Sequence, residues 1–171
     1  MPDIKVLAFD TGGTVLDWHG GLIAALAECG VRRGIECDWH GFANEYRWRS
    51  LKRMLGAVDP EQNIDGVHRS VLDELLAEDG RMDALSSEDR RSIAQRWHEL
   101  DAWPDFRPAL ERLRSPYICA SFTILTLSLV IDVAGRSAPK AALNDGRAKV
   151  MQTRETLTER ASARVPSKWS E

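Results

Sequence analysis

Apolar and polar positions divide this chain into a short strand, a long helical stretch, a second strand and a helix. Residues 4–9 are apolar except for Lys5 and run into the Gly-rich turn TGGT, which predicts a short buried strand. From residue 20 to about residue 101, apolar side chains recur at helical spacing throughout. Residues 117–122 (YICASF) are the second strand candidate, and Thr126 can N-cap a helix after it.

Five helices are expected between the two strands. They are a helix around residues 22–26 that ends near Gly30, one over 39–54, one over 64–76 stopped by Asp79-Gly80, one begun by a capping box at Ser86-Ser87-Glu88-Asp89, and a short one that starts at Pro104. The tetrapeptide DWHG occurs at 17–20 and at 38–41 without extending further, which indicates two similar helix starts rather than a repeat. This order favours a parallel strand pair whose crossover contains an inserted helical domain.

Composition describes an ordinary globular protein. The chain has 171 residues, which is enough for one domain or a core with a small appendage, and it is 43% hydrophobic with a net charge of −3. This balance favours neither a nucleic acid nor an anionic membrane as partner. Three cysteines without a CxxC pair, together with an N-terminus unlike a signal peptide, predict a cytoplasmic location. The longest apolar stretch, residues 122–134, is too short and too polar to span a membrane.

Composition changes near Gly135. Residues 136–171 hold eight basic and four acidic side chains, whereas the whole chain has 23 and 26, so the rest of the chain is acidic. Residues 149–163 are expected to form a polar helix, and no further apolar strand is expected. The abrupt change suggests a truncated or frameshifted reading frame.

Asp10 is the strongest candidate for chemistry. It follows the apolar run VLAF directly and precedes paired glycines. Desolvating an unpaired carboxylate is unfavourable, so an acid at the end of a buried strand is typical of a nucleophile at the carboxyl edge of a parallel sheet. The alternative is that Asp10 only N-caps the next helix.

Several segments together resemble one known family. VLAFDTGGTVLDWHG, the helical stretch, HELDAWPDFRPALERLR and YICASFT before a helix are similar to the haloacid dehalogenase superfamily, and most closely to its type II 2-haloacid dehalogenases. The resemblance covers residues 4 to about 135. It implies an α/β fold in which a Rossmann-like core with a partial parallel sheet (1–16 and 102–171, with 136–171 atypical) carries an inserted all-helical cap (17–101).

The resemblance also implies a reaction. Asp10 would displace halide from C2 of a short 2-haloalkanoic acid, and water would hydrolyse the resulting ester. No metal or other cofactor is expected, the partner is this small-molecule substrate, and a homodimer is compatible with the sequence. Phosphatases of the superfamily carry a second Asp two residues after the nucleophile as a general acid, and here that residue is Gly12. Because halide leaves without a proton, Gly12 favours carbon–halogen over phosphoester chemistry.

Four further residues are site candidates. The resemblance assigns Arg47 to the halide or the substrate carboxylate, which suits its bidentate fork. The alternative is that Arg47 belongs to a solvated basic helix face with its basic neighbours Arg49, Lys52 and Arg53. Thr123 matches the Ser/Thr that hydrogen-bonds the nucleophile or the substrate. Thr14 is expected to fix the turn after Asp10, and Thr11 is expected to contact substrate together with Gly12.

The sequence also departs from the family pattern. Asn usually follows the Ser/Thr of the second strand, and here the residue is Ile124. The lysine that neutralises the carboxylates has no clear counterpart: Lys140 and Lys149 lack its context, and Gln152 or Arg154 stands at the counted position. The polar fourth motif has no candidate. A small-molecule phosphatase and a catalytically inactive member of the superfamily therefore remain alternatives, and the four histidines show no metal-ligand spacing.

Overall fold

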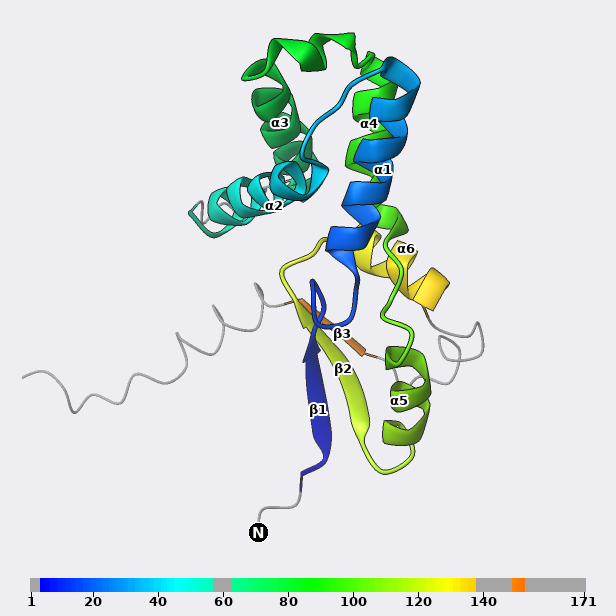
Figure 1. Ribbon diagram of the computed structural model, residues 1–171. Helices are drawn as coiled ribbons and strands as arrows, with labels where there is room; N and C mark the ends of the chain where they lie inside the picture. Colours follow the sequence, from blue (N-terminus) through cyan, green and yellow to red (C-terminus); the bar gives the residue numbers. More distant parts are fainter. Residues whose placement is uncertain (1–3, 57–62, 138–148, 153–171) are drawn as a thin grey trace, which may run out of the picture.

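The computed structural model describes residues 4–56, 63–137 and 149–152. Its elements are β1 (Val6–Asp10), α1 (Trp18–Arg33), α2 (Trp39–Gly56), α3 (Ile64–Ala77), the short 3-10 helix η1 (Gly80–Ala84), α4 (Ser87–Gln95), the 3-10 helix η2 (Arg96–Glu99), α5 (Phe106–Leu113), β2 (Ile118–Thr123), α6 (Leu127–Ser137) and β3 (Lys149–Gln152). The helices α1 to α4 gather at one end of the molecule, the strands and α5 lie at the other, and α6 lies between them (Figure 1).

The strands form a parallel sheet in the order β1-β2-β3. Val6 pairs with Ile118 and Asp10 with Phe122, so the carboxyl ends of β1 and β2 meet at one edge. The whole helical stretch lies between these two strands in the sequence. The expected parallel pair with an inserted helical cap is therefore confirmed.

The strand β3 corrects the expectation for the tail. Residues 149–152 were expected to begin a polar helix, but they form a strand that pairs with β2, with Thr123 opposite Gln152. Four residues with polar ends carry little strand signal, and backbone hydrogen bonds to a neighbouring strand decide their conformation instead. The rest of the expected helix, 153–163, lies outside the described residues.

Both DWHG segments begin a helix in the same way. The Asp17 carboxylate accepts a hydrogen bond from the Gly20 backbone N–H at 2.8 Å, and Asp38 accepts one from Gly41 at 3.0 Å. A Cβ at either glycine would lie 2.3 to 2.5 Å from the capping carboxylate, so the glycine makes room for the cap. The reading of DWHG as two similar helix starts is confirmed.

The first helix is longer than expected. It continues past Gly30 to Arg33 and ends at Gly34, which has the left-handed φ of 67° of a helix C-cap. Gly30 lies inside the helix because the Trp39 ring packs against it: a Cβ there would be 2.3 Å from Trp39 Cζ2. A glycine needed for packing was therefore misread as a stop signal.

The fourth helix starts with the expected capping box. Ser86 accepts a hydrogen bond from the Asp89 backbone N–H, and the Asp89 carboxylate accepts one from the Ser86 backbone N–H. Arg33, at the end of α1, donates to the same carboxylate at 2.7 Å. Hydrogen bonds from Ser86 lower the pKa of Asp89 to about 2, although burial opposes the shift. The carboxylate therefore stays charged and ties α1 to α4.

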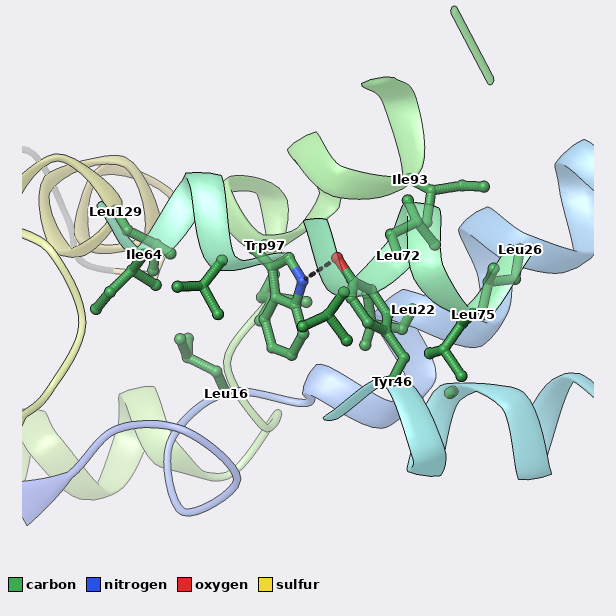
Figure 2. Close-up of a cluster of buried hydrophobic side chains, with 14 of the residues drawn as sticks. Leu16, Leu22, Leu26, Tyr46, Ile64, Leu72, Leu75, Ile93, Trp97 and Leu129 are labelled. Carbon is green, nitrogen blue, oxygen red and sulfur yellow. Dashed lines mark hydrogen bonds between the residues drawn. The ribbon is translucent and has the colours of Figure 1, made fainter. Parts of the chain in front are cut away.

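One buried cluster joins the inserted helices to α6. Leu22, Leu72, Ile93 and Trp97 pack together within the cap, and Leu129 extends the cluster into α6 (Figure 2). The helix that follows β2 is thus packed directly against the cap. The division at residues 17 and 102 stays a prediction.

A histidine reinforces this junction. His98 of η2 lies between two carboxylates, with Nε2 3.0 Å from Asp65 Oδ1 on α3 and Nδ1 2.7 Å from Asp132 Oδ2 on α6. Burial lowers the pKa of His98, but the hydrogen bonds to Asp132 and Asp65 outweigh it and raise the pKa overall. The charged imidazolium can donate to both carboxylates at once, whereas neutral imidazole can donate to one.

The sheet is covered unevenly. Phe9 packs edge-on against Phe106 of α5, with ring centres 5.9 Å apart. On the other face Val6 and Ile118 are each 50% exposed and Phe122 is 48% exposed. Asp10, on this exposed face, is exposed as well, so the expectation of a buried strand that ends on a desolvated acid is wrong for this face. None of the helices in the described part of the chain is long and apolar enough to span a membrane.

Candidate active site

Asp10 ends β1 and is not a helix cap. Asp17 caps the next helix, as described above, so the alternative role considered for Asp10 is wrong. The Thr14 hydroxyl donates to Asp10 Oδ2 at 3.0 Å. This hydrogen bond ties the Oδ2 oxygen of the carboxylate to the turn that follows the strand.

The turn after Asp10 is held by its own backbone. The Thr11 carbonyl accepts from the Val15 and Leu16 backbone N–H groups at 3.1 and 3.0 Å. Gly13 has a φ of 103°, which side chains with a Cβ rarely adopt. Its carbonyl accepts a hydrogen bond from Trp103 Nε1 at 3.0 Å. The second glycine of the motif is thus explained by conformation.

Thr11 links the two strands. Its buried hydroxyl lies 2.6 Å from Ser121 Oγ on β2. This contact fixes the start of the turn against the neighbouring strand. That Thr11 contacts substrate stays a prediction, and Ser121 is a partner that the sequence pattern did not single out.

The first glycine of the motif is explained by a contact with the cap. A Cβ added at Gly12 would lie 3.2 Å from Arg47 Nη2, which is tighter than ordinary van der Waals contact. The guanidinium therefore occupies the space beside position 12. The structure brings together Gly12, from the strand turn, and Arg47, from α2, which the sequence had assigned to one site.

Arg47 differs from the other arginines of its helix. Arg49 pairs with Glu45 and Glu78, and Arg53 pairs with Glu74 at 2.7 Å, all on the surface. Among the described residues, no carboxylate lies within ion-pair distance of Arg47. The alternative of one solvated basic face therefore holds for Arg49 and Arg53 but not for Arg47.

The electrostatic setting of Arg47 is unusual. Burial lowers the pKa of its guanidinium, while the charge of Asp10 opposes that shift. Its Cζ lies 5.8 Å from the ring centre of Trp18 and 5.5 Å from that of Trp97. A half-buried cation that lies against two rings, and whose N–H donors pair with no acid in the described part of the chain, is suited to bind an anion.

Two threonines with different roles lie between the second strand and α6: Thr123 ends β2, and Thr126 directly precedes α6. Thr123 is buried, and its Oγ1 accepts from the Leu125 backbone N–H at 3.2 Å. Thr126 Oγ1 accepts from the Leu129 backbone N–H at 3.4 Å as α6 begins, which confirms it as a helix cap. The partner of Asp10 in the sheet is Phe122, one residue before Thr123. The role of Thr123 toward the nucleophile or substrate stays a prediction.

The register of β3 locates the candidates for the missing lysine. Lys149 pairs with Ala120, two positions before Phe122, which is the partner of Asp10. Gln152 pairs with Thr123 at the carboxyl edge of the sheet. The edge position of the third strand is therefore a glutamine. Lys140 and Arg154 lie outside the described residues. Within those residues no group of three acidic, histidine or cysteine side chains could hold a metal ion.

Comparison with solved structures finds L-2-haloacid dehalogenases. A defluorinating enzyme of this kind aligns with a TM-score of 0.73 and 26% identity, over 95% of this chain and 70% of its own. A second aligns with a TM-score of 0.68 and 26% identity, over 78% of this chain and 58% of its own. The enzyme from Xanthobacter autotrophicus, with chloropropionic acid covalently bound, aligns with a TM-score of 0.62 and 18% identity, over 86% of this chain and 55% of its own.

The protein-family models and curated proteins compared with the sequence give no match. The chain covers little more than half of two of these structures and seven tenths of the first. It has the α/β fold of the haloacid dehalogenase superfamily, with a helical cap inserted between its first two strands. Within that superfamily it is similar in structure to the L-2-haloacid dehalogenases.

Proposed function

We propose that this protein is a hydrolase that removes halide from a short 2-haloalkanoic acid, with Asp10 as nucleophile. The observation that carries the proposal is Arg47, a half-buried cation without a carboxylate partner among the described residues, beside Gly12 in the turn of the nucleophile. Residues 17–101 act as the cap that supplies this arginine. The similarity to L-2-haloacid dehalogenases at 26% identity supports the same chemistry.

In the proposed reaction, the positive charge of Arg47 and the negative charge of Asp10 have separate tasks. Arg47 binds the substrate carboxylate or the departing halide, and Thr14 orients Asp10 through Oδ2. Asp10 Oδ1 forms a bond to C2 while the C2–halogen bond breaks and halide leaves with its electron pair. Water then adds to the carbonyl carbon of the ester; one of its protons leaves with the substrate oxygen, and the other is released to solvent. The products are a 2-hydroxyalkanoic acid and the regenerated carboxylate.

The neighbourhood of Gly12 argues against a phosphatase. That chemistry uses an acid at this position to protonate the leaving alkoxide, and general acids contribute roughly 10²- to 10⁴-fold. Arg47 Nη2 lies 3.2 Å from the position of a Cβ at residue 12, so an acid there would pair with it. Halide needs no proton to leave. The contact therefore favours a carbon–halogen bond as the bond that breaks.

Halide release tests the proposal. The protein is incubated with L-2-chloropropionate and with chloroacetate, and chloride is measured over time. We expect release by the wild type and none by Asp10→Asn. Arg47→Met removes the anion-binding charge and should lower kcat/KM at least about 10²-fold, since hydrogen bonds to charged groups contribute a few kcal/mol.

Arg49→Met is the matched control, because Arg49 lies on the same helix but pairs with Glu45 and Glu78 on the surface. Its kcat/KM should stay within about twofold of the wild type, as for a surface ion pair. If folded wild-type protein releases no chloride from either acid, the proposal is wrong, and the alternative of a catalytically inactive protein is favoured. Turnover of p-nitrophenyl phosphate with Mg²⁺ would support the phosphatase alternative.

A further inference from the structure

The guanidinium of Arg47 lies against an indole ring from a distant part of the cap. Trp97 belongs to η2, is 2% exposed, and has its ring centre 5.5 Å from Arg47 Cζ. Trp18, at the start of α1, contributes a second ring at 5.8 Å. Both distances fall within the range of about 6 Å over which an aromatic ring attracts a cation. Three segments of the cap thus converge on one side chain.

The Trp97 ring is itself fixed in place. Its Nε1 donates to Tyr46 Oη at 3.1 Å, as Figure 2 shows, and Tyr46 Oη donates to the His68 backbone carbonyl at 3.0 Å. The His68 ring stacks on Trp97 with centres 4.2 Å apart and an interplanar angle of 11°. Burial, with a smaller contribution from Arg47, lowers the pKa of His68 to about 3, so this stacked ring is neutral.

We propose that Trp97 is a positioning residue that holds the Arg47 guanidinium over Gly12. This rests on the proposed function, in which Arg47 binds the substrate anion. An acidic partner would also hold the arginine, but it would occupy the N–H donors and neutralise the charge. An aromatic ring attracts the cation through its face and leaves the donors for the ligand. Holding one rotamer beforehand reduces the entropy lost on binding.

The test distinguishes the effect of the aromatic ring of Trp97 from the effect of its size. Trp97→Leu removes the ring, Trp97→Phe keeps an aromatic face, and Trp48→Leu is the control, since Trp48 lies on α2 but is 59% exposed. The first readout is the order parameter of the Arg47 Nε–Hε bond from proton–nitrogen NMR relaxation, which reports how rigidly the guanidinium is held. We expect this order parameter to fall in Trp97→Leu, to fall less in Trp97→Phe, and to stay unchanged in Trp48→Leu.

The second readout is binding of L-2-chloropropionate, measured in an Asp10→Asn background so that no ester forms. We expect about tenfold weaker binding for Trp97→Leu, because affinity falls in proportion to the population of the Arg47 rotamer that can bind, and we expect that population to fall about tenfold. Trp97→Phe should bind within about threefold of the parent, because the cation–π contact is largely kept.

A purely structural Trp97 would give a different result. Trp97→Leu would then lower the unfolding midpoint while the Arg47 order parameter and the affinity stay unchanged, which overturns the proposal. If the parent itself binds no chloropropionate, the proposed function fails, and the order parameter still decides whether Trp97 orders Arg47. If Trp97→Leu does not fold, Tyr46→Phe removes the hydrogen bond at Trp97 Nε1, and an unchanged Arg47 order parameter there also overturns the proposal.

Discussion

Replacing Tyr46 with Phe should destabilise the protein by removing one buried hydroxyl. That hydroxyl accepts a hydrogen bond from Trp97 Nε1 and donates one to the His68 carbonyl. Tyr46 is fully buried and Trp97 is 2% exposed, so water cannot replace the lost partner. Burial raises the pKa of Tyr46, which keeps the hydroxyl protonated.

The size of the effect follows from which group is left unpaired. The His68 carbonyl lies inside α3 and keeps its helical hydrogen bond, so it loses only a second donor. The Trp97 N–H is a donor with one proton, and it loses the one acceptor that it has among the described residues. A buried donor without a partner costs about 1–3 kcal/mol. We expect the free energy of unfolding to fall by that amount.

Urea unfolding followed by circular dichroism measures the change. The midpoint should fall while the slope of the free energy against urea stays constant, because the surface exposed on unfolding does not change. Tyr117→Phe is the matched control. Tyr117 is half-buried, and its hydroxyl forms no hydrogen bond within the described residues, so its loss should stay within about 0.5 kcal/mol. Equal losses for the two variants would refute the reasoning.

Two further predictions follow from the cap. Because the folded pKa of His98 is raised above 6.5, its pairing with Asp65 and Asp132 stabilises the protein below that pH and is lost as pH rises through the folded pKa. Unfolding measured from pH 5 to 9 should show this decline, of about 1 kcal/mol for such half-exposed carboxylates, and His98→Gln should flatten it. Gly12→Asp should pair with Arg47 and reduce chloropropionate binding at least about tenfold in calorimetry, whereas undiminished binding would contradict the proximity of the two side chains.

Local signals predicted the elements that depend on local chemistry. The capping box at Ser86 and the two DWHG starts use side chains and backbone groups within one turn, so the sequence alone indicates them. Gly30 shows where such reasoning fails. It is a glycine because Trp39 packs on it, and a contact nine residues away in the chain leaves no local signal. The same holds for β3, whose conformation depends on pairing with β2.

The candidate site also combines local contacts, which the sequence indicates, with contacts between distant residues, which it does not. The motif around Asp10 was sufficient to identify the turn and its hydroxyl Thr14, because these residues interact within five positions. The choice among Arg47, Arg49 and Arg53 was not decided by spacing. Glutamates on neighbouring turns and on α3 pair with the other two, and only the packed cap shows which arginine has no acidic partner among the described residues.

The sequence by itself determined a strand that ends on Asp10, a helical insertion and a return strand, because apolar periodicity and turn residues act over short distances. Only the tertiary structure decided that Gly12 leaves room for Arg47 and that Arg47 packs against the Trp97 ring. The same holds for the contacts of Tyr46 and His68 that fix this ring. Ring stacking, cation–π attraction and buried hydrogen bonds depend on side chains far apart in the chain. Their positions follow from how the cap packs.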